Sequence, residues 1–362
     1  MVRTLASVAE RVPVTFFTPD SAEAVHGYAR EQLGLTLPPG LTLHTLPSVR
    51  RLAGLTLNGV FFRACRKALI EAAPELVWLR SDKLAAHLAH RAWRGPLVYE
   101  AHLIGSLWAR DRGDSPRRAA RLHELESAIY GHATGVAAIS QGLLDEVRAR
   151  FGFHGAACVA PSAVDTGVFR PCWNGGDGRT VAYVGTLQFW KGLDVLLEAI
   201  KLAPELRLLV VGGGSTDEED ALRTHIAQLG ITERVELAGR LAQTRIAERV
   251  AGAACAVHPL PPKHSISARF TSPLKVVEYM ALGLPVVASD VPSARELLRD
   301  GFNARLCPGE DAAALAGALR EVCTDGVLAR TLSSNALAGI SEHTYQARAE
   351  RLLALFQQCV KA

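Results

Sequence analysis

A helix signal followed at once by a strand signal, in residues 270–296 (FTSPLKVVEYMALGLPVVASDVPSARE), constrains the fold of this chain most. Ser272 favours a helix N-cap, and Pro273 suits the first helical position because its missing N–H costs no hydrogen bond there. The pattern predicts a helix that runs to about Leu282 and ends at Gly283. The apolar run PVVAS that follows predicts a short buried strand.

The first turn of this predicted helix carries the charges expected of an anion-binding site. Its unpaired backbone N–H groups and the positive end of the helix dipole favour a phosphate, and Lys275 adds a full charge. Glu278 projects from the same face, so the pair could grip a diphosphate and the ribose attached to it. Leu274, together with positions 277 and 281, is predicted to face the core. The alternative is an amphipathic helix on which Lys275 and Glu278 form a solvated pair.

This stretch resembles the donor-site signature S-P-x-K-x-x-E-Y-M-A-x-G-x-P-V-V-A-S of family-4 retaining glycosyltransferases with the GT-B fold. The resemblance implies two Rossmann-like α/β domains that face each other across a cleft. It also implies transfer of a sugar from a nucleoside diphosphate to an acceptor with retention of configuration, without a divalent metal or other cofactor. Glu278 would then bind the ribose. Phe270 occupies the place where the family often has a second Glu.

Other segments resemble further parts of that donor site. In residues 185–200 (GTLQFWKGLDVLLEAI), Gly185 would let the backbone approach a ligand, and Lys191 would bind the diphosphate. Thr186 stands where the family has an Arg. Lys191, Lys275 and the helix start at Ser272 would stabilise the charge that develops on the leaving diphosphate. By resemblance the nucleotide would also meet Gly213, Arg240, Leu241, Pro273 and Leu274, and the sugar His258, Phe270 and Glu296.

A histidine follows directly after the strand predicted at residues 96–100 (PLVYE). Ligands of open α/β sheets bind at the carboxyl ends of strands, so His102 is well placed. Members of the resembled family often have a strand ending in E-x-H here, with the histidine near the transferred sugar. A structural or surface histidine is the alternative.

A chain of 362 residues is long enough for two domains, and helix and strand alternate at short spacing, which favours parallel sheets flanked by helices. We expect an N-terminal acceptor-side domain over residues 1–171 and a glycine-rich linker at 172–178 (CWNGGDG). A nucleotide-sugar-binding domain should cover 179–342. By resemblance, a final helix in 343–362 crosses back to the first domain. The resemblance covers residues 95–362 well and the first part of the chain poorly.

The start of the chain lacks an expected element. Residues 1–10 are predicted to be helical and residues 12–18 (VPVTFFT) to be a strand, so the first strand of the domain and its glycine-rich loop are missing. Our hypothesis is that translation of the natural protein starts upstream of Met1. The alternative is a shortened domain.

Charge is unevenly distributed along the chain. Residues 1–175 hold 20 Lys+Arg and 15 Asp+Glu, a net +5, and the remaining residues hold 20 and 21, a net −1. This imbalance favours an acidic acceptor or contact with an anionic membrane surface, and no nucleic-acid partner is expected. The helix predicted at residues 59–72 places Arg63, Arg66 and Lys67 on its polar side. The seven cysteines form no C-x-x-C pair, which predicts free thiols in the cytoplasm, where the protein could lie at the inner face of the cell membrane.

Two other functions remain open at this point. A nucleotide-sugar epimerase would need acid and base groups, for which His102, His258 and Glu296 are the candidates. A nucleotide-binding protein without catalysis is the second alternative. The sequence indicates neither the nucleotide, the sugar nor the acceptor.

Overall fold

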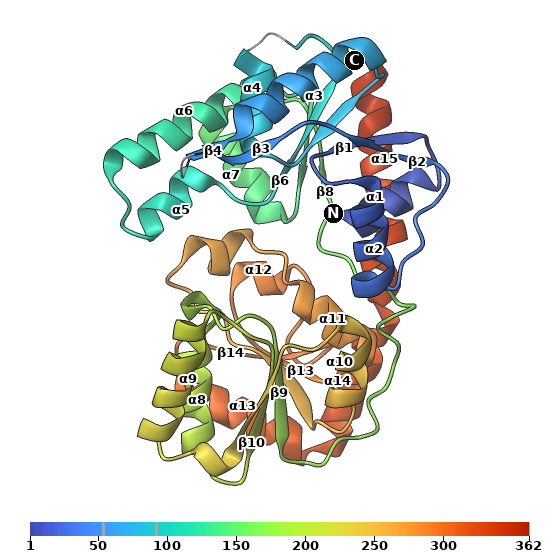
Figure 1. The fold of residues 1–362 in the computed structure, drawn as a ribbon. Helices are drawn as coiled ribbons and strands as arrows, with labels where there is room; N and C mark the ends of the chain where they lie inside the picture. The colour runs from blue at the N-terminus through green and yellow to red at the C-terminus, as the bar shows by residue number, and fades with distance from the viewer. Residues whose placement is uncertain (53–54, 91–92, 362) are drawn as a thin grey trace. The chain divides into compact units, whose positions relative to one another are not determined.

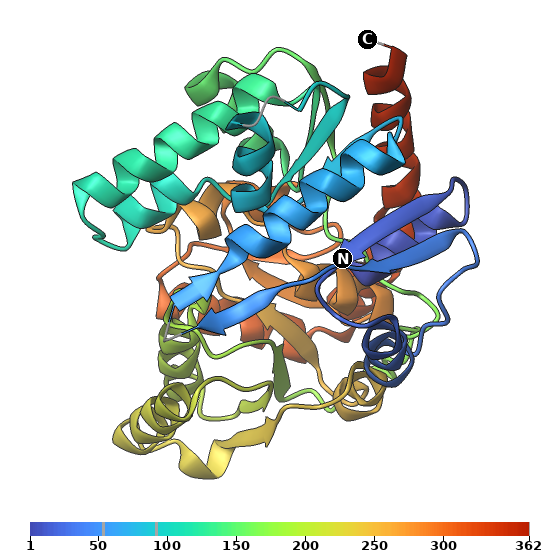
Figure 2. The same ribbon diagram turned by 45° about the horizontal axis from the view of Figure 1, so that its top comes forward.

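The computed structural model describes residues 1–52, 55–90 and 93–361, which form two compact units. Unit 1 comprises Met1–Pro161 and Tyr345–Ala362, and unit 2 comprises Ser162–Thr344. The chain therefore passes between the units twice (Figures 1 and 2). Residues 172–178, the range predicted as a linker, lie in unit 2, where the N–H groups of Cys172 and Trp173 donate to the carbonyl of Leu282 at 3.0 and 3.2 Å.

The centre of unit 2 is a six-stranded parallel sheet in the order β11-β10-β9-β12-β13-β14. After β9 the chain adds strands on one side, and with β12 it returns to the other side of β9. The sheet therefore has a topological switch point between β9 and β12, where ligands of such sheets bind. The strands are β9 (Thr180–Val184), β10 (Arg207–Val211), β11 (Val235–Gly239), β12 (Cys255–His258), β13 (Val286–Ser289) and β14 (Arg305–Cys307).

Side chains of β9 alternate between two apolar cores, one on each face of the sheet. Val181 and Tyr183 pack in one core and Ala182 and Val184 in the other, as the two-residue period of a strand requires. Helices α8, α9 and α13 supply the first core and α10, α11 and α12 the second, while α14 contributes to both (Figure 1). Their bounds are α8 (Leu193–Leu202), α9 (Thr216–Gln228), α10 (Gln243–Val250), α11 (Leu274–Leu282), α12 (Pro292–Arg295), α13 (Ala312–Thr324) and α14 (Gly326–Ala338).

Unit 1 contains a four-stranded parallel sheet whose strands follow chain order, β5-β6-β7-β8. Strands β1 and β2 pair in a separate parallel sheet, and β3 and β4 form an antiparallel pair. The strands are β1 (Val14–Thr18), β2 (Leu41–Thr45), β3 (Val49–Leu52), β4 (Leu55–Leu57), β5 (Val77–Leu79), β6 (Leu97–Ala101), β7 (Gly135–Ala138) and β8 (Ala156–Val159).

The last helix, α15 (Tyr345–Lys361), belongs to unit 1 and packs on β6, β7, β8 and α1 (Figures 1 and 2). Leu352, Leu355 and Cys359 are buried there against Val98 and Ala137. The other helices of unit 1 are α1 (Val2–Ala9), α2 (Ala22–Leu33), α3 (Asn58–Ala72), α4 (Asp82–His90), α5 (Gly105–Asp111), α6 (Pro116–His132) and α7 (Gln141–Phe151).

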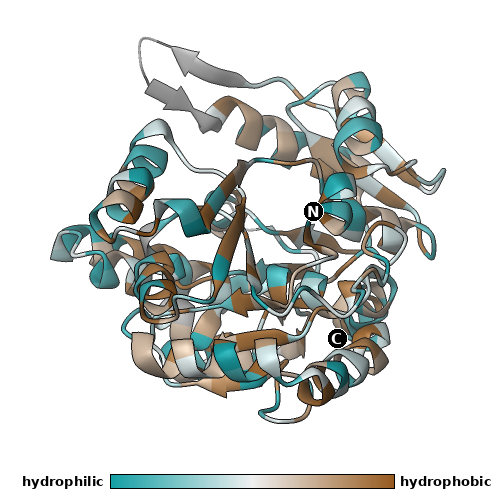
Figure 3. Ribbon diagram, turned by 90° about the horizontal axis from the view of Figure 1, so that it is seen from below, coloured by the Kyte–Doolittle hydropathy of each residue, from teal (hydrophilic) through white to brown (hydrophobic). Residues whose placement is uncertain are grey.

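Most helices of both units show hydrophilic and hydrophobic residues in turn along their length (Figure 3). This mixture is typical of helices that bury one side and expose the other. Within the described residues, we find no helix whose length and apolar content would let it cross a bilayer.

Candidate functional site

The candidate site of unit 2 is built where β9, β10 and β12 end. Gly185 follows β9 directly, and its N–H donates to the carbonyl of Val211 at 2.9 Å. Gly212 lies so close to it that a Cβ at position 212 would be 1.8 Å from the Gly185 carbonyl oxygen. These two glycines therefore let the ends of β9 and β10 approach each other at the switch point.

The side chain of Lys275, on the first turn of α11, points to the end of β9 at Gly185. Its Nζ lies 3.9 Å from the ring centroid of Tyr183, and a Cβ at Gly185 would be only 2.8 Å from that Nζ. The Nζ atom is buried and has no hydrogen-bond partner among the described residues. Burial, together with the positive charge of Lys191, lowers the pKa of Lys275 well below its usual value, while Glu278 opposes this shift. A buried ammonium group without an acceptor is costly, so this position suits an anionic ligand.

Two further basic side chains, His258 and Lys191, belong to the same site. His258, the last residue of β12, is 2% exposed, and neither of its ring nitrogens has a hydrogen-bond partner in the part of the chain that the structure describes. Burial, and then the charges of Lys275 and Lys191, lower the pKa of His258 well below its usual value. Lys191, in the 3₁₀ turn η1 (Phe189–Lys191), holds its Nζ 3.6 Å from the ring centroid of Trp190, and burial lowers its pKa to about 8. The arrangement can bind a phosphate or diphosphate group.

The start of α11 differs from the prediction. The helix begins at Leu274, after an extended Pro273, and Ser272 does not cap it. The Ser272 hydroxyl instead accepts the N–H of Ser162 at 2.7 Å, and the Ser272 carbonyl accepts the Ser162 hydroxyl at 2.7 Å. The prediction of a Ser272 cap was therefore wrong, because this distant partner in the sequence uses both oxygens. Leu274 is 39% exposed and does not face the core, whereas Val277 and Ala281 are buried as predicted.

Glu278 lies one turn after Lys275 and is 8% exposed. The neighbouring Tyr279 is fully buried, and its hydroxyl accepts the N–H of Val184 at 2.7 Å, which fixes α11 to the end of β9. Sequence reasoning assigned no role to Tyr183, Tyr279 or Trp190. Tyr279 lies inside the quoted signature, so its position was visible there, but its partner in β9 was not.

The remaining donor-site candidates lie on several elements of unit 2 and differ in exposure. Arg240 donates from Nη2 to the carbonyl of Gly214 at 3.2 Å, and its side chain fills the space where a Cβ at Gly213 would stand. Leu241 is 36% exposed, and Thr186 and Glu296 are also exposed. Phe270, at the end of η3 (Ile266–Phe270), is 2% exposed, and the guanidinium of Arg269 lies 5.4 Å from its ring centroid.

His102 belongs to unit 1, where it follows β6. Its Nε2 lies 2.6 Å from Oε1 of Glu100, and the same oxygen accepts a hydrogen bond from Arg348 at 2.6 Å. Burial lowers the pKa of His102, and the neighbouring carboxylate acts in the opposite direction. Sequence reasoning missed Arg348, because it is separated from Glu100 by more than two thirds of the chain and lies in a helix without a motif.

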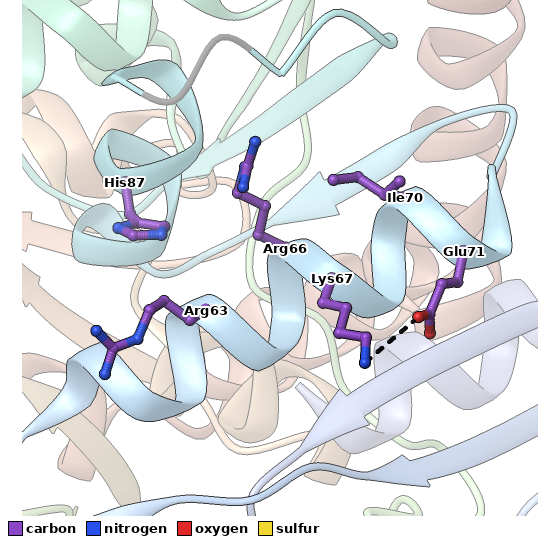
Figure 4. Close-up of a pocket in the computed structure, with 6 residues that line it drawn as sticks. All are labelled: Arg63, Arg66, Lys67, Ile70, Glu71 and His87. Atoms are coloured by element: carbon purple, nitrogen blue, oxygen red, sulfur yellow. Dashed lines mark ion pairs between the residues drawn. The ribbon is translucent and has the colours of Figure 1, made fainter.

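A pocket of about 470 Å³ lies on unit 1 between α3 and α4 (Figure 4). Arg63, Arg66 and Lys67 project from α3 and His87 from α4, and Lys67 pairs with Glu71 at 3.7 Å. The basic side of the helix predicted at residues 59–72 therefore lines a pocket. Ile70 completes its wall and is 57% exposed.

A parallel sheet whose switch point holds a buried lysine Nζ without a hydrogen-bond partner among the described residues, together with a second α/β unit, is typical of nucleotide-binding α/β proteins. Comparison with known families narrows this class. Residues 1–162 match the family "Glycosyl transferase 4-like domain", and residues 178–325 match the family "Glycosyl transferases group 1". The chain belongs to the family-4-type glycosyltransferases with the GT-B fold. The predicted family and fold class are thus confirmed.

Curated relatives agree with this assignment. The chain is similar to D-inositol 3-phosphate glycosyltransferases of Acidothermus cellulolyticus (28% identical over 312 residues, 78% of this chain) and Mycobacterium leprae (28% over 292 residues, 75% of this chain). It spans 66% of the length of each of these relatives.

Solved structures share the fold. Sucrose-phosphate synthase from Thermosynechococcus elongatus matches with a TM-score of 0.80 at 20% identity, over 99% of this chain and 92% of that one. Anabaena HepE in complex with UDP matches with a TM-score of 0.75 at 19% identity, over 98% and 95%. Anabaena HepE in complex with UDP-glucose matches with a TM-score of 0.73 at 18% identity, over 99% and 93%.

Proposed function

We propose that this chain is a retaining, metal-independent glycosyltransferase that moves a sugar from a nucleoside diphosphate to an acceptor. One observation carries the proposal. The Nζ of Lys275 is buried at the switch point of the sheet, beside Gly185 and over Tyr183, without a hydrogen-bond partner among the described residues. A diphosphate would supply the missing acceptor and the opposite charge.

The same site then stabilises the leaving group. When the bond between the sugar and the diphosphate breaks, negative charge grows on the diphosphate oxygens. Lys275, Lys191 and the N-terminal turn of α11 are already in place to receive it, so little reorganisation is needed. Glu278 binds the ribose, and Gly213, Arg240 and Leu241 border the base. His102 acts on the transferred sugar.

The donor nucleotide to test first is a uridine nucleotide. Anabaena HepE, which shares the fold, was solved with UDP and with UDP-glucose. The matched families and the relatives named above are transferases, and they lend no support to an epimerase.

The acceptor that we propose carries an anionic group. The relatives are named D-inositol 3-phosphate glycosyltransferases, and the pocket on unit 1 presents Arg63, Arg66, Lys67 and His87, with one carboxylate, Glu71, paired with Lys67 (Figure 4). A phosphate monoester would meet several charge-assisted donors there. An acceptor held at an anionic membrane surface would use the same charges.

A panel of nucleotide sugars with and without inositol phosphates tests the proposal. Release of nucleoside diphosphate that depends on the acceptor indicates transfer, isomerised donor indicates an epimerase, and neither product indicates a binding protein. Lys275→Met should weaken UDP binding at least 10-fold while leaving the weak binding of uridine unchanged. Lys201→Met on the exposed end of α8 is the matched control. Equal losses of UDP and uridine binding would place Lys275 away from the phosphates.

A further inference from the structure

A buried arginine in the first turn of α15 joins three parts of unit 1. Arg348 is 5% exposed, and its Nη2 donates to Oε1 of Glu100 at 2.6 Å. Its Nη1 donates to the carbonyl oxygens of Ala160 and Pro161. One guanidinium group thus links the last helix, the central strand β6 and the segment after β8.

These carbonyls belong to the last residues before the chain leaves unit 1. The first passage to unit 2 lies between Pro161 and Ser162, and the return lies between Thr344 and Tyr345, three residues before Arg348. On the unit 2 side the two passages are also joined, because Val164 and Thr344 form a β-bridge. On the unit 1 side, the hydrogen bonds from Arg348 to Ala160 and Pro161 join the same two chain passages.

The carboxylate that Arg348 holds is also the partner of His102. Glu100 is 2% exposed on β6, and the same Oε1 lies 2.6 Å from Nε2 of His102. Burial would raise the pKa of Glu100, but the hydrogen bond from His102 and the charge of Arg348 lower it to about 2, so the group is ionised. An ionised carboxylate only accepts hydrogen bonds. His102 must therefore donate from Nε2, which leaves the lone pair of the neutral ring on Nδ1.

We infer that Arg348 is a positioning residue for His102: by holding the Glu100 carboxylate and the carbonyls of Ala160 and Pro161 at once, it fixes the tautomer and orientation of the histidine ring. The inference rests on the proposed function for the part that His102 plays in transfer. The positioning itself rests on the contacts above. It also makes the geometry at His102 depend on the segment through which the chain leaves the unit.

Removal of the guanidinium has an effect of known sign on His102. The charged groups that act on the imidazole are Glu100 on β6, Arg80 after β5 and Arg348 on α15. Glu100 raises the pKa of His102, whereas Arg80 and Arg348 lower it. Without Arg348, Glu100 keeps its proximity to the ring but loses its strongest cationic partner. His102 should then bind its second proton at a higher pH than in the wild type, so that less of it is in the neutral Nε2–H form.

Nuclear magnetic resonance of the histidine side chains tests this inference on the full chain. In the wild type, the ring nitrogen shifts of His102 should report the Nε2–H tautomer. In Arg348→Gln the pKa of His102 should rise, because a positive charge that lowers it is removed. Arg348→Lys, which keeps the charge but cannot hold three acceptors in a planar fork, should restore only part of the wild-type pKa and tautomer. Unchanged His102 shifts in folded Arg348→Gln would overturn the inference.

Because Arg348→Gln leaves a buried carboxylate without its cation, it can lower the stability of the fold. Arg348→Met combined with Glu100→Gln removes both charges and serves as the second variant. It should fold, but His102 should lose its tautomer preference. Arg3→Met is the matched control, since Arg3 is a buried arginine of the same unit whose guanidinium donates to Leu33 and lies over the ring of Tyr345. Arg3→Met should leave the His102 shifts as they are in the wild type.

Kinetics separate this inference from the proposed function. If the wild type transfers sugar, Arg348→Gln should lower kcat roughly 10-fold or more while the KM for the donor changes little. A rise in the KM for the donor with an unchanged kcat would contradict positioning of His102. If the wild type transfers no sugar from any donor while the magnetic resonance changes occur, the proposed function fails and the positioning by Arg348 stands.

Discussion

Gly185 and Lys275 occupy adjoining space: a Cβ on the glycine would lie 2.8 Å from Nζ of the lysine and 3.1 Å from its Cε. The glycine is separated from the lysine by a large part of unit 2, yet its missing side chain decides whether the lysine can reach the end of β9. The backbone at Gly185 has a φ of 158°, which side-chain-bearing residues rarely adopt.

Gly185→Ala should therefore displace the ammonium group of Lys275 and weaken the binding of UDP. We expect a loss of roughly 10-fold in affinity, with a fall in unfolding free energy of about 1–3 kcal/mol from the backbone strain. Isothermal titration calorimetry and chemical denaturation measure the two effects. Gly317→Ala on the exposed side of α13, where a Cβ meets nothing within 4 Å, is the control and should not affect UDP binding. Unchanged UDP affinity in folded Gly185→Ala would contradict this account of Lys275.

The pKa of about 8 at Lys191 predicts a pH dependence of donor binding. Only the protonated amine attracts a diphosphate, so UDP affinity should fall as the pH rises through about 8. The bound diphosphate raises the pKa of the amine, and binding above this pH should therefore take up protons. Titration calorimetry in two buffers of different ionisation enthalpy, from about pH 7 to about pH 9.5, measures both effects.

Lys191→Arg should flatten this pH dependence, because a guanidinium stays charged throughout the range. Any dependence of UDP affinity on pH that remains in this variant would come from Lys275, whose pKa is also lowered. The stability of the free protein has the opposite trend. The pKa of Lys191 is lower in the folded state, about 8, than in the unfolded state, near 10.5. Between these two pH values the unfolded chain binds more protons, so the free energy of unfolding increases as the pH rises. A pH-independent UDP affinity in the wild type would exclude Lys191 from the phosphate site.

Glu278 gives a prediction about the ribose. Glu278→Gln should lower kcat/KM for a uridine-diphosphate sugar strongly, because under the proposed function this buried carboxylate accepts the ribose hydroxyls and an amide is a weaker acceptor. The discriminating measurement compares UDP with 2′-deoxy- and 3′-deoxy-UDP. The wild type should bind one deoxynucleotide roughly 10-fold or more weakly than UDP, and Glu278→Gln should lose most of that difference. If the variant keeps the full preference for the ribose hydroxyls, the assignment of Glu278 is wrong.

Local sequence signals predicted the elements that form the site. The helix α11 ends at Leu282 with a left-handed Gly283, and the strand after it is present as β13, because capping and apolar runs act over a few residues. The same local reasoning failed at Ser272, whose oxygens are used by Ser162. A side chain that suits a cap caps a helix only if no distant partner takes it.

The electrostatic arrangement of the site could not be predicted from the sequence alone. Tyr183 under Lys275 and Arg348 beside Glu100 are pairs whose members lie on different elements. Neither residue type nor spacing specifies such partners, since the order of strands in the sheet and the docking of α15 decide them. Resemblance proposed roles for Lys275 and Glu278 because the signature runs through one helix, and it assigned no role to Arg348 because α15 carries no such signature.

The docking of α15 on unit 1 gives the last prediction. Gly135 at the start of β7 lies under Cys359, and a Cβ at position 135 would be 2.4 Å from Sγ of Cys359 and 3.2 Å from Cγ2 of Val98. Gly135→Ala should overpack this contact and lower the free energy of unfolding by about 1–3 kcal/mol. Cys359→Ala alone should also destabilise, because it removes a sulfur atom from a buried position.

The double variant decides whether this contact is the cause. In Gly135→Ala/Cys359→Ala the new methyl group takes up part of the space that the sulfur leaves. The summed losses of the two single variants should therefore exceed the loss of the double variant by about 0.5–3 kcal/mol. The rescue should be partial, since Val98 and Leu355 remain close to the new methyl group. Additive losses in urea denaturation would show that Gly135 does not set the approach of α15 to the sheet.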